Sequence, residues 1–254
     1  MCSISYFSKE YFIKNIKKDP EEYVDKVEDR WLDSLWILSL EKWKRKISKV
    51  MPSIKQQYFT DEIQSDYAKE IKQVDSSCMI HLRNSSVWAV TLKNGHPYNW
   101  NRYVLAQNWT SRDLHAFFKI KWELEWFNHS AHWESDSAAL LSYIEYQDYK
   151  NLKDIYIMLK KVVDVLWVIF IYDKQTGNAL IYTDWCREFF ISIKDNVLLR
   201  AENYKSDTEK NRYSEAYIIF NFETGKIIEK KGMTYKKAVS NTYQPWMYGG
   251  VCNY

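Results

Sequence analysis

The alternation of apolar and polar positions changes along this chain of 254 residues, and its most apolar stretch covers residues 162–182. Residues 165–172 form an almost unbroken run of β-branched and aromatic side chains, which is typical of a strand buried on both faces. Residues 173–178 end in a glycine and an asparagine, either of which can take a positive φ, and residues 179–182 are apolar again. The pattern predicts a hairpin at the centre of a sheet, with Trp167 in the core.

Strict alternation of apolar and charged residues over 118–126 predicts a half-buried strand, with Trp122 facing the core and the lysines facing water. A strand is also expected over 86–92, followed by an Asn-Gly pair at 94–95 that is the strongest short turn signal in the chain. Because a proline comes soon after this turn, the return strand is expected later, near residues 100–105.

Two further hairpins are expected in the last third of the sequence. Residues 189–193 and 197–200 are apolar and flank a polar turn, although residues 184–194 are also compatible with a helix. Residues 216–222 and 226–230 flank a Glu-Thr-Gly turn and predict a second hairpin.

Helical spacing of apolar residues is concentrated near the N-terminus. Asp19 can cap a helix and Pro20 suits its first turn, so we predict a helix over 20–49 that ends before a later proline. A second helix is expected over 60–74. These helices lead us to expect that residues 1–76 form a helical N-terminal part.

The predicted fold class is α+β. Two shorter helices are expected over 138–144 and 152–161, beside the predicted strands. Residues 77–254 are therefore expected to form a mostly antiparallel sheet with helices packed on one face, centred on the 162–182 hairpin. The helical part and the sheet part could also together form one continuous domain.

Composition narrows the possible classes of protein. The net charge is +3 and charged residues make up 27%, a balance that does not by itself predict a nucleic acid or a membrane as partner. The 6 glycines argue against a glycine-rich phosphate loop. The 12 tryptophans and 20 tyrosines indicate either large core residues or a recognition surface.

The four cysteines are scattered and form no Cys-x-x-Cys pair, so neither a zinc knuckle nor a redox motif is expected: Cys2, Cys78, Cys186 and Cys252. We expect reduced thiols and a cytoplasmic protein. Charged residues interrupt the apolar residues at the N-terminus, and no apolar run approaches about 20 residues, so neither a signal peptide nor a membrane span is expected.

Two groups of residues are candidate binding sites. The first, the aromatic cluster, follows the Asn-Gly turn and could hold a sugar, a base or a peptide: His96, Tyr98, Trp100, Arg102, Tyr103 and Trp109. Its alternate members could equally be core residues. The second, the basic cluster, could bind phosphates with a stacking tryptophan, or could be the solvated end of the predicted helix: Lys42, Trp43, Lys44, Arg45 and Lys46.

His129 and His132 are the residues that come nearest to a metal-ligand pair, with Asp136 and His115 as possible further ligands. Their spacing matches no established metal signature, and Asp136 is equally suited to capping the next helix. We therefore expect no bound metal and no cofactor.

Recognised catalytic signatures, such as Gly-x-Ser-x-Gly, do not occur in the sequence, and Cys186 has only a neighbouring arginine to favour its thiolate. We therefore expect a non-enzymatic cytoplasmic protein that binds another macromolecule, above all a protein, for example as an inhibitor or immunity-type protein. One alternative is a module that binds RNA or single-stranded nucleic acid. Another is a hydrolase or transferase with a histidine-containing site that includes His96, His115, His129 or His132.

Overall fold

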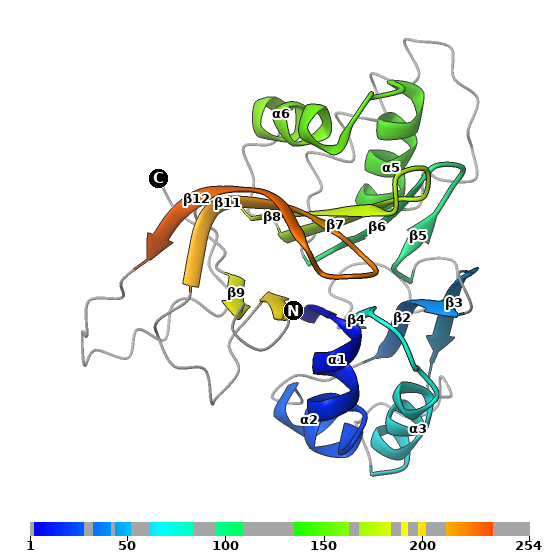
Figure 1. The fold of residues 1–254 in the computed structure, drawn as a ribbon. Helices are drawn as coiled ribbons and strands as arrows, with labels where there is room; N and C mark the ends of the chain where they lie inside the picture. Colours follow the sequence, from blue (N-terminus) through cyan, green and yellow to red (C-terminus); the bar gives the residue numbers. More distant parts are fainter. Residues whose placement is uncertain are drawn as a thin grey trace, which may run out of the picture.

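Four layers make up the molecule: helices, a sheet, a second sheet and further helices (Figure 1). The computed structural model of the chain describes residues 3–27, 33–41, 44–51, 61–83, 95–108, 135–162, 168–183, 189–192, 198–201 and 212–235.

The first sheet is antiparallel, with the strand order β3-β2-β4-β1. Its strands are β1 (Ser3–Phe7), β2 (Ser34–Glu41), β3 (Lys44–Val50) and β4 (Cys78–Arg83). β1 pairs with β4 on one side and with β10 (Leu198–Ala201) on the other. β10 pairs with β9 (Phe189–Ser192), which pairs with β11 (Arg212–Asn221) and so connects the first sheet to the second.

The second sheet continues from β11 in the order β11-β8-β7-β6-β5, and β12 (Ile227–Tyr235) pairs with the other edge of β11. Its remaining strands are β8 (Asn178–Thr183), β7 (Val168–Asp173), β6 (Tyr103–Gln107) and β5 (Tyr98–Asn99). The two sheets are therefore the two ends of one hydrogen-bonded antiparallel ladder that folds over on itself, as Figure 1 shows.

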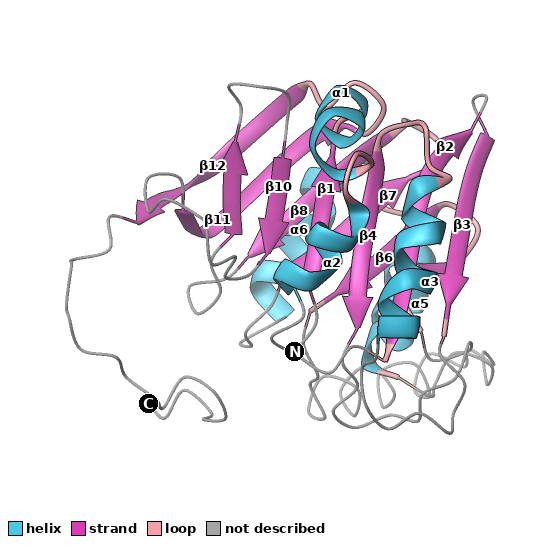
Figure 2. Ribbon diagram, turned by 90° about the horizontal axis from the view of Figure 1, so that it is seen from below, coloured by secondary structure: helices cyan, strands magenta, loops and turns pink. Residues whose placement is uncertain are grey.

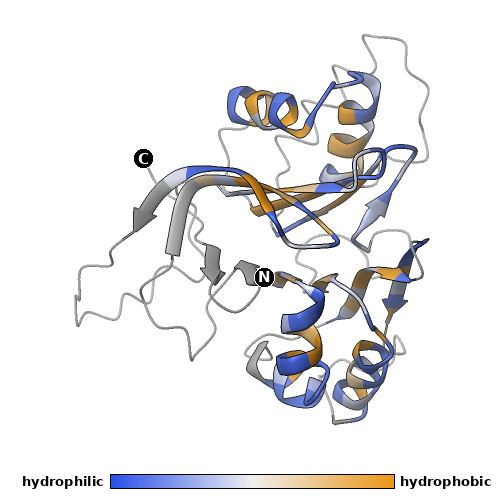
Figure 3. Ribbon diagram, viewed as in Figure 1, coloured by the Kyte–Doolittle hydropathy of each residue, from blue (hydrophilic) through white to orange (hydrophobic). Residues whose placement is uncertain are grey.

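Helices cover the outer face of each sheet (Figure 2). The first sheet carries α1 (Lys9–Tyr11), a π-helical turn η1 (Phe12–Ile16), α2 (Pro20–Val27) and α3 (Asp61–Lys72). The second carries α5 (Asp136–Tyr146) and α6 (Leu152–Val162). Figure 3 shows apolar residues along the facing strands, whereas much of the outward surface of the helices is hydrophilic.

Three apolar cores fill the spaces between the four layers. Between the two sheets, Tyr6 contacts Phe220 and Phe222, and its hydroxyl donates to the carbonyl of Phe222 at 2.8 Å. Between the first sheet and its helices, Phe7, Leu35 and Ile37 pack with residues such as Phe12, Ile63 and Tyr67. Between the second sheet and α5 and α6, Leu105, Ile169 and Leu180 pack with Leu140, Ile144, Ile155 and Leu159. Each large apolar side chain buried in this way contributes about 1.5–3 kcal/mol.

The predicted 162–182 hairpin is confirmed as β7 and β8, which lie inside the second sheet between β6 and β11. Local chemistry explains its turn, because Gly177 takes a φ of +71° and the carboxylate of Asp173 accepts the backbone N–H of Gln175 at 2.9 Å. The hairpins β9–β10 and β11–β12 are also confirmed, and β9 excludes a helix over 189–192. The helices α3, α5 and α6 lie where the sequence predicted them.

The predicted fold class is wrong in two respects. First, the N-terminal part is not helical: its first element is the strand β1, and the helix predicted over 20–49 ends at Val27 and is followed by β2 and β3. Residues 35–38 are consecutive apolar side chains, all fully buried, so they occupy both faces of a strand, as a helix with one apolar side could not. Second, helices cover both sheets, because each sheet has an outer apolar face that water would otherwise contact.

Several predictions fall outside the described residues: the strands over 86–92 and 118–126, and the burial of Trp167. The helices that the structure describes include none that is long and apolar enough to cross a membrane.

Candidate functional site

A group of polar side chains is buried where β2 begins, β4 ends and α5 begins. We call it the polar cluster, and its members are Asp33, Ser34, His81, Arg83, His96, Asp136 and Ser137. Apart from Asp33, every member is at most 7% exposed. Because burying polar groups is costly unless they are paired, a concentration of them between apolar layers marks a candidate site.

Strand register brings the first part of the polar cluster together. In the β2–β4 ladder Ser34 lies opposite Arg83 and Trp36 opposite His81. In the β1–β4 ladder Ser3 lies opposite Leu82, next to Arg83. Met79 on β4 packs in the core between the two sheets. Since side chains alternate along a strand, His81 and Arg83 lie on the same face of β4 as Met79.

An ion pair and two hydrogen bonds hold Arg83. Its Nη1 lies 3.4 Å from Asp33 Oδ1, and the backbone N–H of Asp33 donates to the carbonyl of Arg83 at 2.8 Å. Ser34 Oγ donates to the same Asp33 oxygen at 2.9 Å. The result is a permanent positive charge at the end of β4, with a side chain that is 6% exposed.

Two imidazoles meet beside this arginine. The rings of His81 and His96 lie edge to face with centroids 4.9 Å apart, and His96 Nε2 lies 2.6 Å from Ser137 Oγ on α5. Burial lowers the pKa of His81 to about 3, and the charge of Arg83 adds to this effect. Burial likewise holds the pKa of His96 well below its usual value, with smaller contributions from His81 and Arg83. Both rings are therefore neutral at physiological pH.

The N-terminus of α5 completes the polar cluster. Ser135 caps the helix by accepting the backbone N–H of Ala138 at 3.1 Å, and its hydroxyl donates to that of Tyr98 at 2.6 Å. The carboxylate of Asp136 accepts the N–H of Ser137 at 2.8 Å and is 3% exposed. The polar cluster thus contains both a cation, Arg83, and an acidic side chain, Asp136.

The structure divides the aromatic cluster predicted from the sequence. His96 belongs to the polar cluster, and Tyr98 contacts it through the ring of His96 and through Ser135. Tyr103 and Trp100 instead pack with the core beneath α5 and α6. Trp109 lies outside the described residues.

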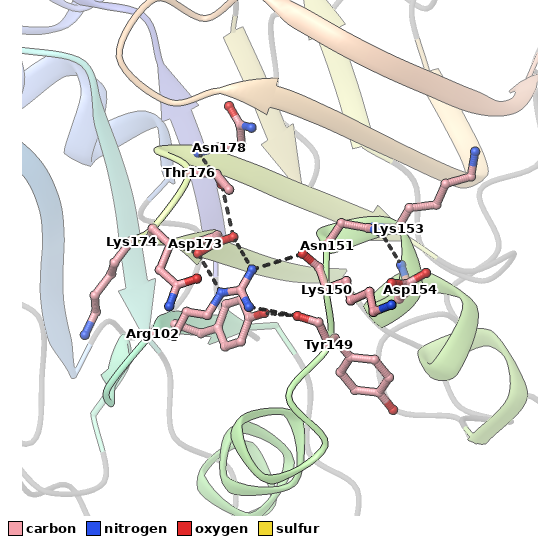
Figure 4. A network of polar contacts seen from close by, with 12 residues as sticks. Arg102, Tyr149, Lys150, Asn151, Lys153, Asp154, Asp173, Lys174, Thr176 and Asn178 are labelled. Carbon is pink, nitrogen blue, oxygen red and sulfur yellow. Dashed lines mark hydrogen bonds and ion pairs between the residues drawn. The ribbon is translucent and has the colours of Figure 1, made fainter.

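Arg102 takes part in a separate network, drawn in Figure 4. Its guanidinium makes two bonds to the carboxylate of Asp173, at 3.0 and 2.9 Å, and one to the carbonyl of Tyr149 at 2.8 Å. These contacts join the start of β6, the β7–β8 turn and the loop between α5 and α6.

The basic cluster lies on a strand rather than at a helix end. Lys44, Arg45 and Lys46 begin β3, at the edge of the first sheet. The ammonium of Lys46 lies 2.9 Å from Glu41, and Arg45 donates to the carbonyl of Lys174 at 3.4 Å. The remaining two members, Lys42 and Trp43, lie outside the described residues.

The possible metal ligands His115, His129 and His132 lie outside the described residues, and Asp136 begins α5. Within the described ranges, no three His, Cys, Asp or Glu side chains form a group that could hold a metal ion.

Asp33, Ser34, His81 and Arg83 were missed by sequence reasoning. The only local signal is on β4, where a histidine and an arginine interrupt an apolar run with a period of two. The partners of these residues come from other segments of the chain, so their meeting is a tertiary feature.

Comparison with known proteins finds no matching protein family and no matching curated protein. Solved structures do match. Glutamine phosphoribosylpyrophosphate amidotransferase from B. subtilis, in complex with ADP and GMP, is 14% identical over 94% of this chain, with a TM-score of 0.60. An allosteric regulatory enzyme of purine biosynthesis is 13% identical over 94% of the chain, with a TM-score of 0.65. A predicted glutamine amidotransferase from Pseudomonas aeruginosa PA01 reaches a TM-score of only 0.46, which is too low to show a shared fold.

This likeness shows a shared fold, and the chain spans half the length of each of the first two neighbours. It corrects the expectation of a non-enzymatic binding protein of the inhibitor or immunity type, because the fold is one that enzymes use. The alternative expectation of a hydrolase or transferase agrees better with these neighbours.

Proposed function

We propose that this chain is an amide hydrolase of the glutamine amidotransferase type, which releases ammonia from the side chain of glutamine with Cys2 as the nucleophile. The catalytic group is then the thiol of Cys2, the residue before β1 in the sequence, and not one of the predicted histidines. Cys2 itself lies outside the described residues.

The observation that carries the proposal is the position of Cys2 in the sequence, directly before β1. It directly precedes Ser3, the first residue of β1, and Ser3 lies opposite Leu82, next to Arg83. Cys2 is therefore the residue directly before a strand that adjoins the polar cluster. One of the enzymes with the same fold is named a glutamine amidotransferase, which supports an amide substrate.

Cleavage of the peptide bond before Cys2 would supply a base. An α-amino group has a pKa of about 7.7–8.0, so part of it is neutral at physiological pH and can accept the thiol proton. The thiolate then attacks the amide carbon, the C–N bond breaks, and the nitrogen leaves as ammonia with the proton that the amine had accepted. Water, deprotonated by the same amine, then attacks the thioester carbon; the C–S bond breaks, glutamate is released, and the thiolate takes back the proton from the amine.

The polar cluster supplies groups that suit an amino acid. The guanidinium of Arg83 suits an α-carboxylate, since its planar donors match a carboxylate, and Asp33 holds the guanidinium in place. The carboxylate of Asp136 suits an α-ammonium group. We propose that these two side chains bind the two charged ends of glutamine.

The second half of an amidotransferase reaction needs an acceptor for ammonia. The chain matches half of each of the first two structural neighbours, and we propose that the acceptor site lies in a further domain or in a partner protein. A cytoplasmic location is part of the same proposal, since it keeps the thiol of Cys2 reduced.

The test is ammonia release from L-glutamine by the purified protein, with the mass of the intact chain measured in parallel. We expect glutaminase activity, loss of every residue before Cys2, and a decrease of at least about a hundredfold in Cys2→Ala. Cys78→Ala is the matched control, because Cys78 is buried on β4 and faces the helices, so its removal should leave activity unchanged.

A glutamine analogue with a diazoketone in place of the amide should attach covalently to Cys2 and to no other residue. Wild-type activity in Cys2→Ala, or a chain that is inactive on glutamine and unlabelled by the analogue, would contradict the proposal.

A further inference from the structure

We propose that Trp36 is a positioning residue that fixes the distance between Arg83 and the segment Gly95–Tyr98. Arg83 and the residues of this segment that contact α5 would then hold the substrate as one rigid unit. This inference rests on the proposed function. Trp36 is fully buried near the start of β2.

The first connection runs from Trp36 to Arg83. The indole Nε1 donates to Ser34 Oγ at 2.7 Å, and Ser34 Oγ donates in turn to Asp33 Oδ1 at 2.9 Å. That oxygen is the one that faces Arg83 Nη1 at 3.4 Å. Because Ser34 has one hydroxyl proton, the indole donor determines the direction in which that proton points and so favours the bond to Asp33.

The second connection runs from Trp36 to Gly95. A Cβ placed on Gly95 would lie 1.6 Å from Cζ2 of the indole, so the backbone rests directly on the ring edge and only glycine fits. Lys49 reinforces this contact: its ammonium lies 4.2 Å from the centre of the Trp36 ring and donates to the carbonyl of Gly95 at 3.4 Å.

Gly95 then leads to the other half of the polar cluster. The next residue is His96, which bonds to Ser137 on α5, and Ser137 follows Asp136 in the first turn of that helix. A displacement of Gly95 would therefore shift His96, and through its bond to Ser137 it would also shift Asp136. In this way Trp36 joins the residue proposed for the α-carboxylate to the one proposed for the α-ammonium group.

Two substitutions separate this role from simple packing. Trp36→Phe keeps an aromatic ring near Gly95 but removes the indole donor, and Ser34→Ala removes the acceptor while leaving Trp36 in place. Ser39→Ala is the matched control, because Ser39 is an equally buried serine on the same strand but alternates to the opposite face. Ser34→Thr keeps the hydroxyl and should restore wild-type behaviour.

The first readout is amide hydrogen exchange, which needs no activity. We expect exchange at Gly95, His96 and Tyr98 to rise about tenfold in Trp36→Phe and Ser34→Ala, the effect of losing one buried hydrogen bond, and to be unchanged in Ser39→Ala. Unchanged exchange in both variants would overturn the inference, whether or not the protein hydrolyses glutamine.

The second readout is the kinetics of glutamine hydrolysis. We expect KM to rise about tenfold in both variants while kcat stays within about twofold, because the binding groups shift and the nucleophile does not. Increased exchange with an unchanged KM would overturn the positioning role. If the wild-type protein has no activity on glutamine, the proposed function fails, and the exchange data alone decide whether Trp36 couples the two segments.

Discussion

At the scale of single residues, His81 and His96 make the stability of this protein sensitive to mild acid. The unfolded chain binds a proton on each ring near pH 6.5, whereas burial lowers the pKa of both rings in the folded chain. Their contribution to stability is therefore fully present above pH 6.5 and is lost as the pH falls toward the folded pKa values. For His81, whose pKa in the folded chain is about 3, this loss is expected to be about 2 kcal/mol between pH 6.5 and pH 5.

We predict that His81→Phe, which keeps a ring but cannot be protonated, loses about 2 kcal/mol less than the wild type between pH 6.5 and pH 5. The measurement is urea unfolding at both pH values. Substitution of an exposed residue, such as Ile13→Ala, is the control and should leave the pH dependence as it is. An equal loss in His81→Phe and the wild type would mean that His81 is not buried as a neutral ring.

The residue scale also shows how far the sequence predicted the candidate site. His96 and Tyr98 were predicted because aromatic and basic residues cluster after a turn signal. Arg83 and Ser137 were missed, since Arg83 only interrupts an apolar strand, Ser137 lies in the first turn of a helix, and the partners of both come from distant segments.

At the scale of elements, the contacts of Arg102 and Asp173 bind three connections into one unit (Figure 4). Asp173 is fully buried, and its oxygens also accept the N–H of Gln175 and the hydroxyl of Thr176. Burial alone would raise the pKa of Asp173, but the bonds from Arg102 and Gln175 outweigh this and lower it. The carboxylate is therefore ionised and paired wherever the protein is folded near neutral pH.

We predict that Asp173→Ala lowers the free energy of unfolding by about 3–5 kcal/mol, because it leaves the Arg102 charge unpaired in a largely buried place. Asp66→Ala is the control: it removes an exposed pair with Lys69 and should cost less than about 1 kcal/mol. Chemical denaturation at neutral pH measures both. A cost under about 1 kcal/mol for Asp173→Ala would show that the network adds little to stability.

Elements also differ in how clearly the sequence predicts them. The turn between β7 and β8 was predicted because its carboxylate and glycine act within a few residues. The strands β2 and β3 were taken for a helix because some of their apolar residues recur at helical spacing. Their true state depends on pairing: β3 pairs with β2, and β2 pairs in turn with β4, which lies far along the chain and is itself buried on both faces.

At the scale of the whole molecule, the two sheets are held together by the core between them. Phe220 is fully buried there, with its ring centre 4.5 Å from that of Tyr6, so it contacts the opposite sheet directly. This core separates the two sheets from water, and it also fixes how closely they approach each other. The polar cluster interrupts it where β4 ends and α5 begins.

We predict that Phe220→Ala costs about 3–5 kcal/mol, because it removes apolar contacts and leaves a cavity between the sheets. Ile228→Ala, at an apolar position on β12 that is 56% exposed, should change stability by less than about 0.5 kcal/mol. Urea midpoints at a constant m-value would measure both. A small effect of Phe220→Ala would mean that the sheets do not depend on this contact.

The sequence by itself determined the local features of this protein: three hairpins, the helices α3, α5 and α6, and the turns that end them. Alternation, caps and turn residues act within a few positions, so they can be recognised in any fold. Only the tertiary structure decided that residues 34–41 and 44–50 are strands, that one ladder folds into two facing sheets, and that Arg83, His96 and Ser137 meet. These outcomes depend on burial between segments far apart in the chain, whose free energy exists only once the layers are packed.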